Sequence, residues 1–143
     1  MNDIEGTTEL VQRLRAISAN VDTFIKNEIE AAGFELELLA KQNASAIQGA
    51  PTDLKQGISM SVENNGFSIV VRQNTLPIGA YYEFGTGVFV QVADEWKDLA
   101  WQFYVNGKGM LPAAPYLYPA YTKVRNNLNA TLQRKLTILI NRS

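Results

Sequence analysis

Residues 80–87, Ala-Tyr-Tyr-Glu-Phe-Gly-Thr-Gly, lie near the middle of the 143-residue chain. Aromatic residues two positions apart predict a strand over 80–84, with Tyr82 and Phe84 on its core face. Glu83 would then lie on the opposite face, toward solvent or another subunit. The Gly-Thr-Gly sequence predicts a turn that ends this strand.

Upstream, residues from about 8 to 48 are predicted to be helical. Two sets of apolar residues recur every three or four positions: Leu10, Leu14, Ile17, Val21 and Phe24, and then Ile25, Ile29, Ala32, Leu36 and Leu39. Thr7 or Thr8 is the expected N-cap, and Gly49 followed by Pro51 is the expected stop.

Unbroken, this helix would be about 60 Å long, whereas a compact domain of this size is about 30 Å across. Two alternatives stay open. Either the helix breaks near residues 18–22, so that 1–19 form a separate N-terminal helix that folds back, or part of it packs on another subunit.

Strand patterns follow this helix and a turn at 51–53. Residues 58–62 alternate between apolar and polar side chains, and residues 67–71 are predicted as the partner strand. Glu63-Asn64-Asn65-Gly66 between them predicts a hairpin turn, because Asn-Gly accepts positive φ angles. Residues 88–92 and 101–105 are also strand-like, with a helical turn capped by Asp94 between them and an Asn106-Gly107 turn after them. Residues 116–141 are predicted to form the closing helix.

The prediction is one α+β domain over 1–143, with a long N-terminal helix, a small antiparallel sheet, a C-terminal helix packed on the sheet, and 88–110 as an elaborated insertion.

The composition restricts the chemistry. The chain has no cysteine and no histidine, which excludes disulfides, thiolate metal sites and Ser-His or Cys-His catalytic pairs. Glu83 has no second acid or base nearby in the sequence, and the acids are not spaced as an oxygen cage for a metal. The Gly85-Thr86-Gly87 and Gly107-Lys108-Gly109 sequences do not match a phosphate-binding loop and are interpreted as turns. We expect no enzymatic activity, no metal and no cofactor.

The net charge of −1 is unevenly distributed. Acidic residues concentrate in the first helix, whereas all the charged residues after Asp98 are basic. The candidates for contact with DNA are Lys123, Arg125, Arg134 and Lys135. Two interpretations remain: two solvated helix faces that attract each other, or a basic helix that faces DNA or an acidic partner. The apolar runs are too short for a membrane span and the acidic N-terminus does not resemble a signal peptide, so we expect a cytoplasmic protein without a membrane partner.

Four segments in a consistent order resemble a known family. They are Ala50-Pro51-Thr52-Asp53, Leu54-Lys55-Gln56-Gly57-Ile58, Tyr81-Tyr82-Glu83-Phe84-Gly85-Thr86-Gly87 and Ala114-Pro115-Tyr116-Leu117-Tyr118-Pro119-Ala120. Together they are similar to the head–tail joining, or tail-completion, proteins of long-tailed phages, over residues 20–130. The chain departs from the family pattern after Asp53, where a Thr-Gly pair is missing, and in its longer, more aromatic residues 88–110.

The resemblance implies a structural virion protein of the phage neck or tail end, assembled in the host cytoplasm as a ring, expected to be a hexamer. Its partners would be head connector or stopper proteins, tail-tube or terminator proteins, and DNA in the channel. The predicted interface residues are Glu83, Thr86, Trp96, Trp101 and Lys108. The alternative function is a DNA-binding accessory protein that uses the basic C-terminal helix.

Overall fold

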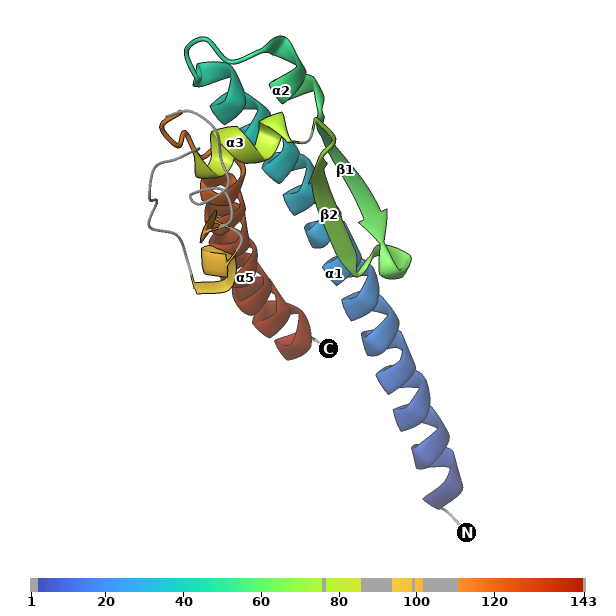
Figure 1. Cartoon of the computed structure of the whole chain (residues 1–143). Helices are drawn as coiled ribbons and strands as arrows, with labels where there is room; N and C mark the ends of the chain where they lie inside the picture. The colour runs from blue at the N-terminus through green and yellow to red at the C-terminus, as the bar shows by residue number, and fades with distance from the viewer. Residues whose placement is uncertain (1–2, 76, 86–93, 99, 102–110, 143) are drawn as a thin grey trace.

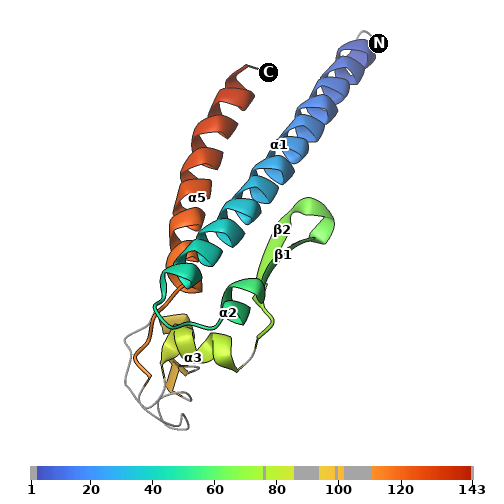
Figure 2. The ribbon, with the colours of Figure 1, turned by 90° about the horizontal axis from the view of Figure 1, so that it is seen from above.

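Helix α1 (Asp3–Ala46) runs the length of the molecule in the computed structural model, with a β-hairpin on one side and α5 (Leu117–Asn141) on the other (Figures 1 and 2). The structure describes residues 3–75, 77–85, 94–98, 100–101 and 111–142. The remaining elements are α2 (Thr52–Gln56), β1 (Ile58–Glu63), the short 3-10 turn η1 (Asn64–Gly66), β2 (Ser68–Gln73), α3 (Ile78–Phe84) and a second 3-10 turn, η2 (Asp94–Trp96).

The long helix is continuous. It includes Asp3, upstream of the predicted caps Thr7 and Thr8, and no break occurs near residues 18–22. Gly33 lies within this continuous helix, and its lack of a side chain lets the hairpin approach closely, because a Cβ there would lie 3.1 Å from Ile69 side-chain atoms. The predicted stop is confirmed, since Gly49 has a φ of 78° and Pro51 follows.

The hairpin also agrees with its prediction. Strands β1 and β2 are antiparallel, with Ile58 opposite Gln73 and Glu63 opposite Ser68. Asn64, Asn65 and Gly66 all have positive φ, as this sequence led us to expect. The hairpin packs on α1, where the Lys26 ammonium lies 4.7 Å from the centre of the Phe67 ring.

The strand predicted over 80–84 is wrong, because these residues belong to helix α3. Backbone bonds from Gly79 N–H to the Thr75 carbonyl and from Tyr81 N–H to the Pro77 carbonyl start it. Gly79 and Glu83, four residues apart, are both buried. Over so few residues the period-two and helical patterns both fit, and the described sheet has only β1 and β2. The segment predicted as a turn at 51–53 likewise leads into the short helix α2.

The predicted helical turn at Asp94 is present as η2, and the closing helix is present as α5. The strands predicted over 88–92 and 101–105, and the turn at Asn106–Gly107, lie outside the described residues except for Trp101, which is helical and not part of a strand.

Small side chains let the two long helices approach closely. The buried face of α1 carries Ala32, Leu36, Ala40 and Ala44, and the facing side of α5 carries Ala120 and Val124. Leu54 and Ile58 complete the core from α2 and β1. Tyr116, just before α5, meets the sheet through a hydrogen bond between its hydroxyl and the Gln73 side chain. The α+β fold class is therefore confirmed. Among the described helices, none is both long enough and apolar enough to span a membrane.

Candidate functional site

The Glu83 carboxylate is buried against the N-terminus of α5. Its side chain accepts three backbone hydrogen bonds: Oε2 from the N–H of Tyr116 (2.9 Å) and of Leu117 (3.0 Å), and Oε1 from that of Tyr118 (2.9 Å). Only 8% of the residue is exposed. A carboxylate at this position also interacts favourably with the positive end of the helix dipole.

These three bonds complete the hydrogen bonding at the start of the helix. The first four N–H groups of a helix lack partners within it; in α5 they belong to residues 116–119. Position 119 is a proline, which has no N–H and is tolerated in the first turn for that reason. Glu83 takes the other three. A side chain 33 residues upstream of Tyr116 thus caps α5 completely.

The sequence prediction placed Glu83 on an exposed face, and this is wrong because the residue is on the buried side of a helix. The sequence did contain a signal that a distant side chain caps α5. Residues 113–117, Ala-Ala-Pro-Tyr-Leu, contain none of the side chains that usually cap a helix locally, and Tyr116 makes no side-chain cap bond. A helix that begins without a local cap needs an acceptor from elsewhere in the fold.

Tyr116 and Gln73 extend this cap into the core. The Tyr116 hydroxyl donates to the Gly79 carbonyl (3.1 Å) and accepts from the Gln73 amide (3.1 Å), which also donates to the Leu54 carbonyl (2.8 Å). On α1, the Asn43 amide donates to the Tyr116 carbonyl (3.0 Å). The network therefore joins α1, α2, β2, α3 and α5 at one end of the molecule.

Burial raises the pKa of Tyr116 above its ordinary value of 10.0, and the negative charge of Glu83 raises it further. The hydrogen bond from Gln73 acts in the opposite direction. The phenol is therefore neutral at physiological pH.

The chain enters and leaves the 86–110 segment at one place. Gly85 ends α3 with a φ of 75°, and a Cβ there would lie 2.9 Å from the Leu111 carbonyl oxygen and from the Ala113 nitrogen. The Ala114 N–H donates to the Tyr82 carbonyl (2.8 Å). The ends of this segment are thus held together beside the Glu83 cap.

An aromatic row crosses the surface next to this point. Trp96 lies 6.4 Å from Phe84 and 6.5 Å from Tyr118 between ring centres, and Tyr118 lies 6.5 Å from Tyr121. The Arg125 guanidinium lies 5.3 Å from the centre of the Tyr121 ring. Trp96 (38%) and Trp101 (54%), which were predicted as interface residues, are both exposed. Thr86 and Lys108 lie outside the described residues.

The four basic residues of α5 do not form one surface. Lys135 is paired with Glu28 of α1 (2.9 Å) and lies 5.9 Å from the centre of the Phe24 ring. Arg125 is engaged by Tyr121. Lys123 and Arg134 are exposed and lie three turns apart on one side of the helix.

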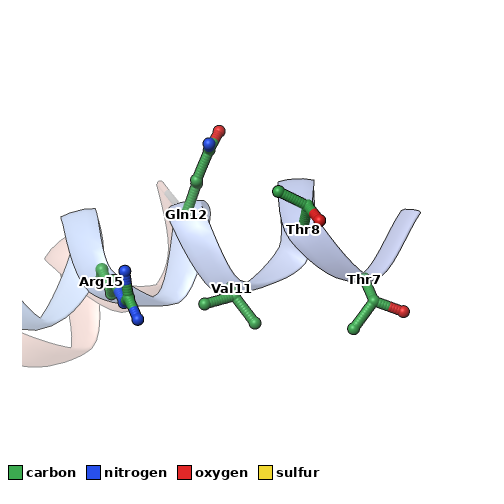
Figure 3. A pocket seen from close by; sticks show the side chains of 5 residues that line it. All are labelled: Thr7, Thr8, Val11, Gln12 and Arg15. Carbon is green, nitrogen blue, oxygen red and sulfur yellow. The ribbon is translucent and has the colours of Figure 1, made fainter. Parts of the chain in front are cut away.

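The N-terminal part of α1 extends beyond the rest of the described fold, past the hairpin and past the end of α5 (Figure 1). Between residues 7 and 20 every residue is exposed except the half-buried Ile17. A shallow hollow here is lined by Thr7, Thr8, Val11, Gln12 and Arg15. All five come from successive turns of the same helix, and Gln12 points away from the side that Thr7 and Val11 share, so the hollow is an open helix surface (Figure 3).

Glu83 links α3 to the start of α5. Both oxygens of Glu83 already accept backbone hydrogen bonds, and within the described residues no group of three acidic side chains is placed to hold a metal. The chain has no match among the family models, the curated proteins or the solved structures with which it was compared. The function must therefore be inferred from the surfaces themselves.

Proposed function

We propose that this chain is a structural virion protein of the phage neck or tail end, which joins the head connector to the tail as one subunit of a ring. The observation that carries the proposal is the exposed N-terminal part of α1. Leu10 and Leu14 are each 56% exposed and Val11 is 39% exposed, on a helix that extends past its own domain. Exposed apolar residues on a rigid helix are typical of a surface that another chain covers.

The segments that carry the family resemblance support the proposal from another side. Ala50 and Pro51 follow the end of α1, and Leu54 is fully buried beneath it. Glu83, from the third segment, caps the helix that the fourth segment opens. The segments thus supply the Glu83 cap and the core residues Leu54, Ile58, Tyr116 and Ala120, as expected if the chain shares the fold of that family.

In this proposal the exposed aromatic residues Trp96 and Trp101 contact the next ring or the neighbouring subunit. Aromatic residues are enriched at such interfaces. Lys123 and Arg134 are the cations of α5 that remain for DNA in the channel, since Arg125 and Lys135 are engaged within the subunit.

The first test is the mass of the purified protein in solution. Light scattering and native mass spectrometry over a wide concentration range should give a closed oligomer of one size, with six copies expected from the resemblance, and electron microscopy should show rings. A protein that stays monomeric at high concentration, alone and with its connector and tail partners, would contradict the proposal.

The second test is genetic. In a phage or prophage that carries the gene, a nonsense mutation should produce lysates with DNA-filled heads and separate tails, and supplying the protein in trans should restore joined particles. Normal yields of infectious particles without the protein would rule the function out.

A further inference from the structure

Two uncovered apolar patches lie on α1, one on each half. The overhang patch consists of Leu10, Val11 and Leu14. The mid-helix stripe consists of Ala31, Phe34 and Leu38, and both larger residues are 58% exposed. Phe34 and Leu38 each stand two residues after a core residue, Ala32 and Leu36, which places them about 200° around the helix from the core face. Leu14 and Phe34, the nearest large residues of the two patches, are 20 positions apart in the sequence, which is about 30 Å along the helix, so the patches are separate surfaces.

The overhang patch has basic flanks. Arg13 lies three residues after Leu10, and Arg15 lies four residues after Val11, so both border the patch on the helix surface. Arg13 is paired with Glu9 at 2.9 Å, but both side chains are mostly exposed, at 74% and 67%. A pair of this kind contributes little and can be exchanged for another.

The mid-helix stripe has acidic flanks. Glu30 lies four residues before Phe34, and Glu35 lies three residues before Leu38. Both are exposed, and neither makes an ion pair within the part of the chain that the structure describes. Lys41, on the other side of Leu38, is already paired with Glu37.

We infer that the overhang patch of one copy packs on the mid-helix stripe of a second copy of this chain. The apolar residues then cover one another, and Arg13 and Arg15 face Glu30 and Glu35. Pairing two overhang patches would instead bring four arginines together, and pairing two stripes would bring four glutamates together. Opposite charge thus favours the unlike pairing and like charge opposes both alternatives.

This contact is heterologous, because it joins two different surfaces and leaves one of each free on the pair. Repetition of such a contact gives a closed ring or an open filament. The inference deepens the ring proposed above and identifies its subunit contact.

Disulfide cross-linking can test the contact directly, because the natural chain has no cysteine. Single variants Leu10→Cys, Leu14→Cys, Phe34→Cys and Leu38→Cys would be prepared in the full-length protein and oxidised alone and in mixtures. At least one mixture of an overhang variant with a stripe variant should give a cross-linked dimer well above the yield of either alone. Gln12→Cys, on the other side of the overhang, mixed with Leu38→Cys is the matched control and should give none. A dominant link between two Leu14→Cys copies would overturn the inference.

Charge reversal gives an independent test. Arg13→Glu with Arg15→Glu, and separately Glu30→Arg with Glu35→Arg, should each weaken self-association by about tenfold or more. Mixing the two reversed proteins should restore it, because each overhang then meets an oppositely charged stripe in the other protein. Unchanged association of each reversed protein alone would overturn the inference.

The outcomes separate this contact from the function. If the protein forms discrete rings, but none of the four pairs of cysteine variants cross-links and charge reversal does not weaken association, the contact is overturned and the proposed ring stands. Cross-linked chains that form open filaments, with normal phage assembly after gene disruption, would support the contact and remove the proposed function. A protein that is monomeric alone but forms rings with its connector and tail partners, without the four cross-links, would overturn the contact and leave the function standing, whereas a protein that is monomeric under both conditions would overturn both.

Discussion

At the scale of single residues, the Glu83 side chain connects two parts of the chain that are 33 to 35 positions apart. Three amide donors would otherwise be left unpaired at the start of α5. An unpaired buried donor costs about 1–3 kcal/mol, and hydrogen bonds to a charged group are stronger than neutral ones. This residue therefore contributes to stability out of proportion to its size.

We predict that Glu83→Gln lowers the free energy of unfolding by about 2 kcal/mol and Glu83→Ala by about 3–4 kcal/mol. The glutamine keeps one acceptor but turns an NH₂ group toward a backbone N–H, whereas alanine removes both acceptors. Urea denaturation followed by circular dichroism measures the change. Asp22→Asn, on an exposed position of α1 outside both patches, is the control and should stay within about 0.5 kcal/mol of the natural protein. Equal, small effects for all three variants would contradict the role of Glu83 as a cap.

The raised pKa of Tyr116 leads us to predict that the protein loses stability at alkaline pH. Because its pKa in the folded protein is above 10.0, the folded state holds the phenol proton more tightly than the unfolded chain does. Raising the pH above about 10 therefore favours unfolding, and this contribution is lost once the pH passes the folded pKa.

Tyr116→Phe should be less stable by about 1 kcal/mol near neutral pH, because two hydrogen bonds are lost. Above pH 10, however, its Tm should fall less steeply than that of the natural protein. Thermal unfolding between pH 8 and pH 11 measures both effects. Parallel curves would show that Tyr116 does not carry the alkaline sensitivity.

At the scale of elements, the fold depends on close approaches that a side chain would block. Gly85 combines a φ of 75° with backbone atoms of Leu111 and Ala113 at 2.9 Å from where a Cβ would stand. Gly49 has nearly the same φ, 78°, but nothing lies within 4 Å of its Cβ position. Alanine substitutions at the two glycines can therefore be compared to separate the cost of backbone strain from the cost of a steric collision.

Gly49→Ala should therefore cost about 1 kcal/mol, which is the strain of the left-handed conformation alone. Gly85→Ala should cost about 3 kcal/mol or more, because the contact between α3 and residues 111–113 must also open. Chemical denaturation of both variants gives the comparison. A Gly85→Ala protein as stable as Gly49→Ala would mean that these two segments are not held together.

The packing interface between α1 and α5 leads to a second prediction at this scale. Ala120 is fully buried against α1, so Ala120→Leu must push the helices apart and should cost about 1–3 kcal/mol. Ala130→Leu, on an exposed position of the same helix, should change stability by less than about 0.5 kcal/mol. Similar Tm values for the two variants would indicate that α5 does not pack on α1 as described.

At the scale of the whole molecule, the main feature is a helix longer than the domain that it supports. The core residues of α1 lie between positions 32 and 44, so the first half of the helix is not needed to build the core. The overhang is therefore expected to serve assembly and to contribute little to folding.

We predict that Leu10→Gln combined with Leu14→Gln leaves the Tm of dilute, monomeric protein within about 2 °C of the natural value, because both side chains are already exposed. The same variant should lose self-association in light scattering at high concentration. A large loss of Tm in the dilute protein would show that the overhang packs on its own domain, and unchanged association would remove it from the interface.

The features of this protein that depend on local signals could be predicted from its sequence. Helical periodicity predicted α1 and α5, Asn-Gly chemistry predicted the hairpin turn, and Gly49 with Pro51 predicted the end of α1. These features need only neighbouring residues, since hydrogen bonding and φ preferences act over a few positions. The α+β class followed from their order.

The role of residues 80–84, in contrast, became clear from the packing of the folded chain. Tyr82, Glu83 and Phe84 fit a strand as well as a helix, because the local pattern is too short to distinguish the two periods. Glu83 attracted attention as an acid, but its role depends on amide donors that lie 33 to 35 positions away. The continuity of α1 was equally open, because a helix can extend beyond its domain only where tertiary contacts anchor part of it. The sequence therefore singled out Glu83, and the packing of α3 against α5 made it a cap instead of an exposed contact.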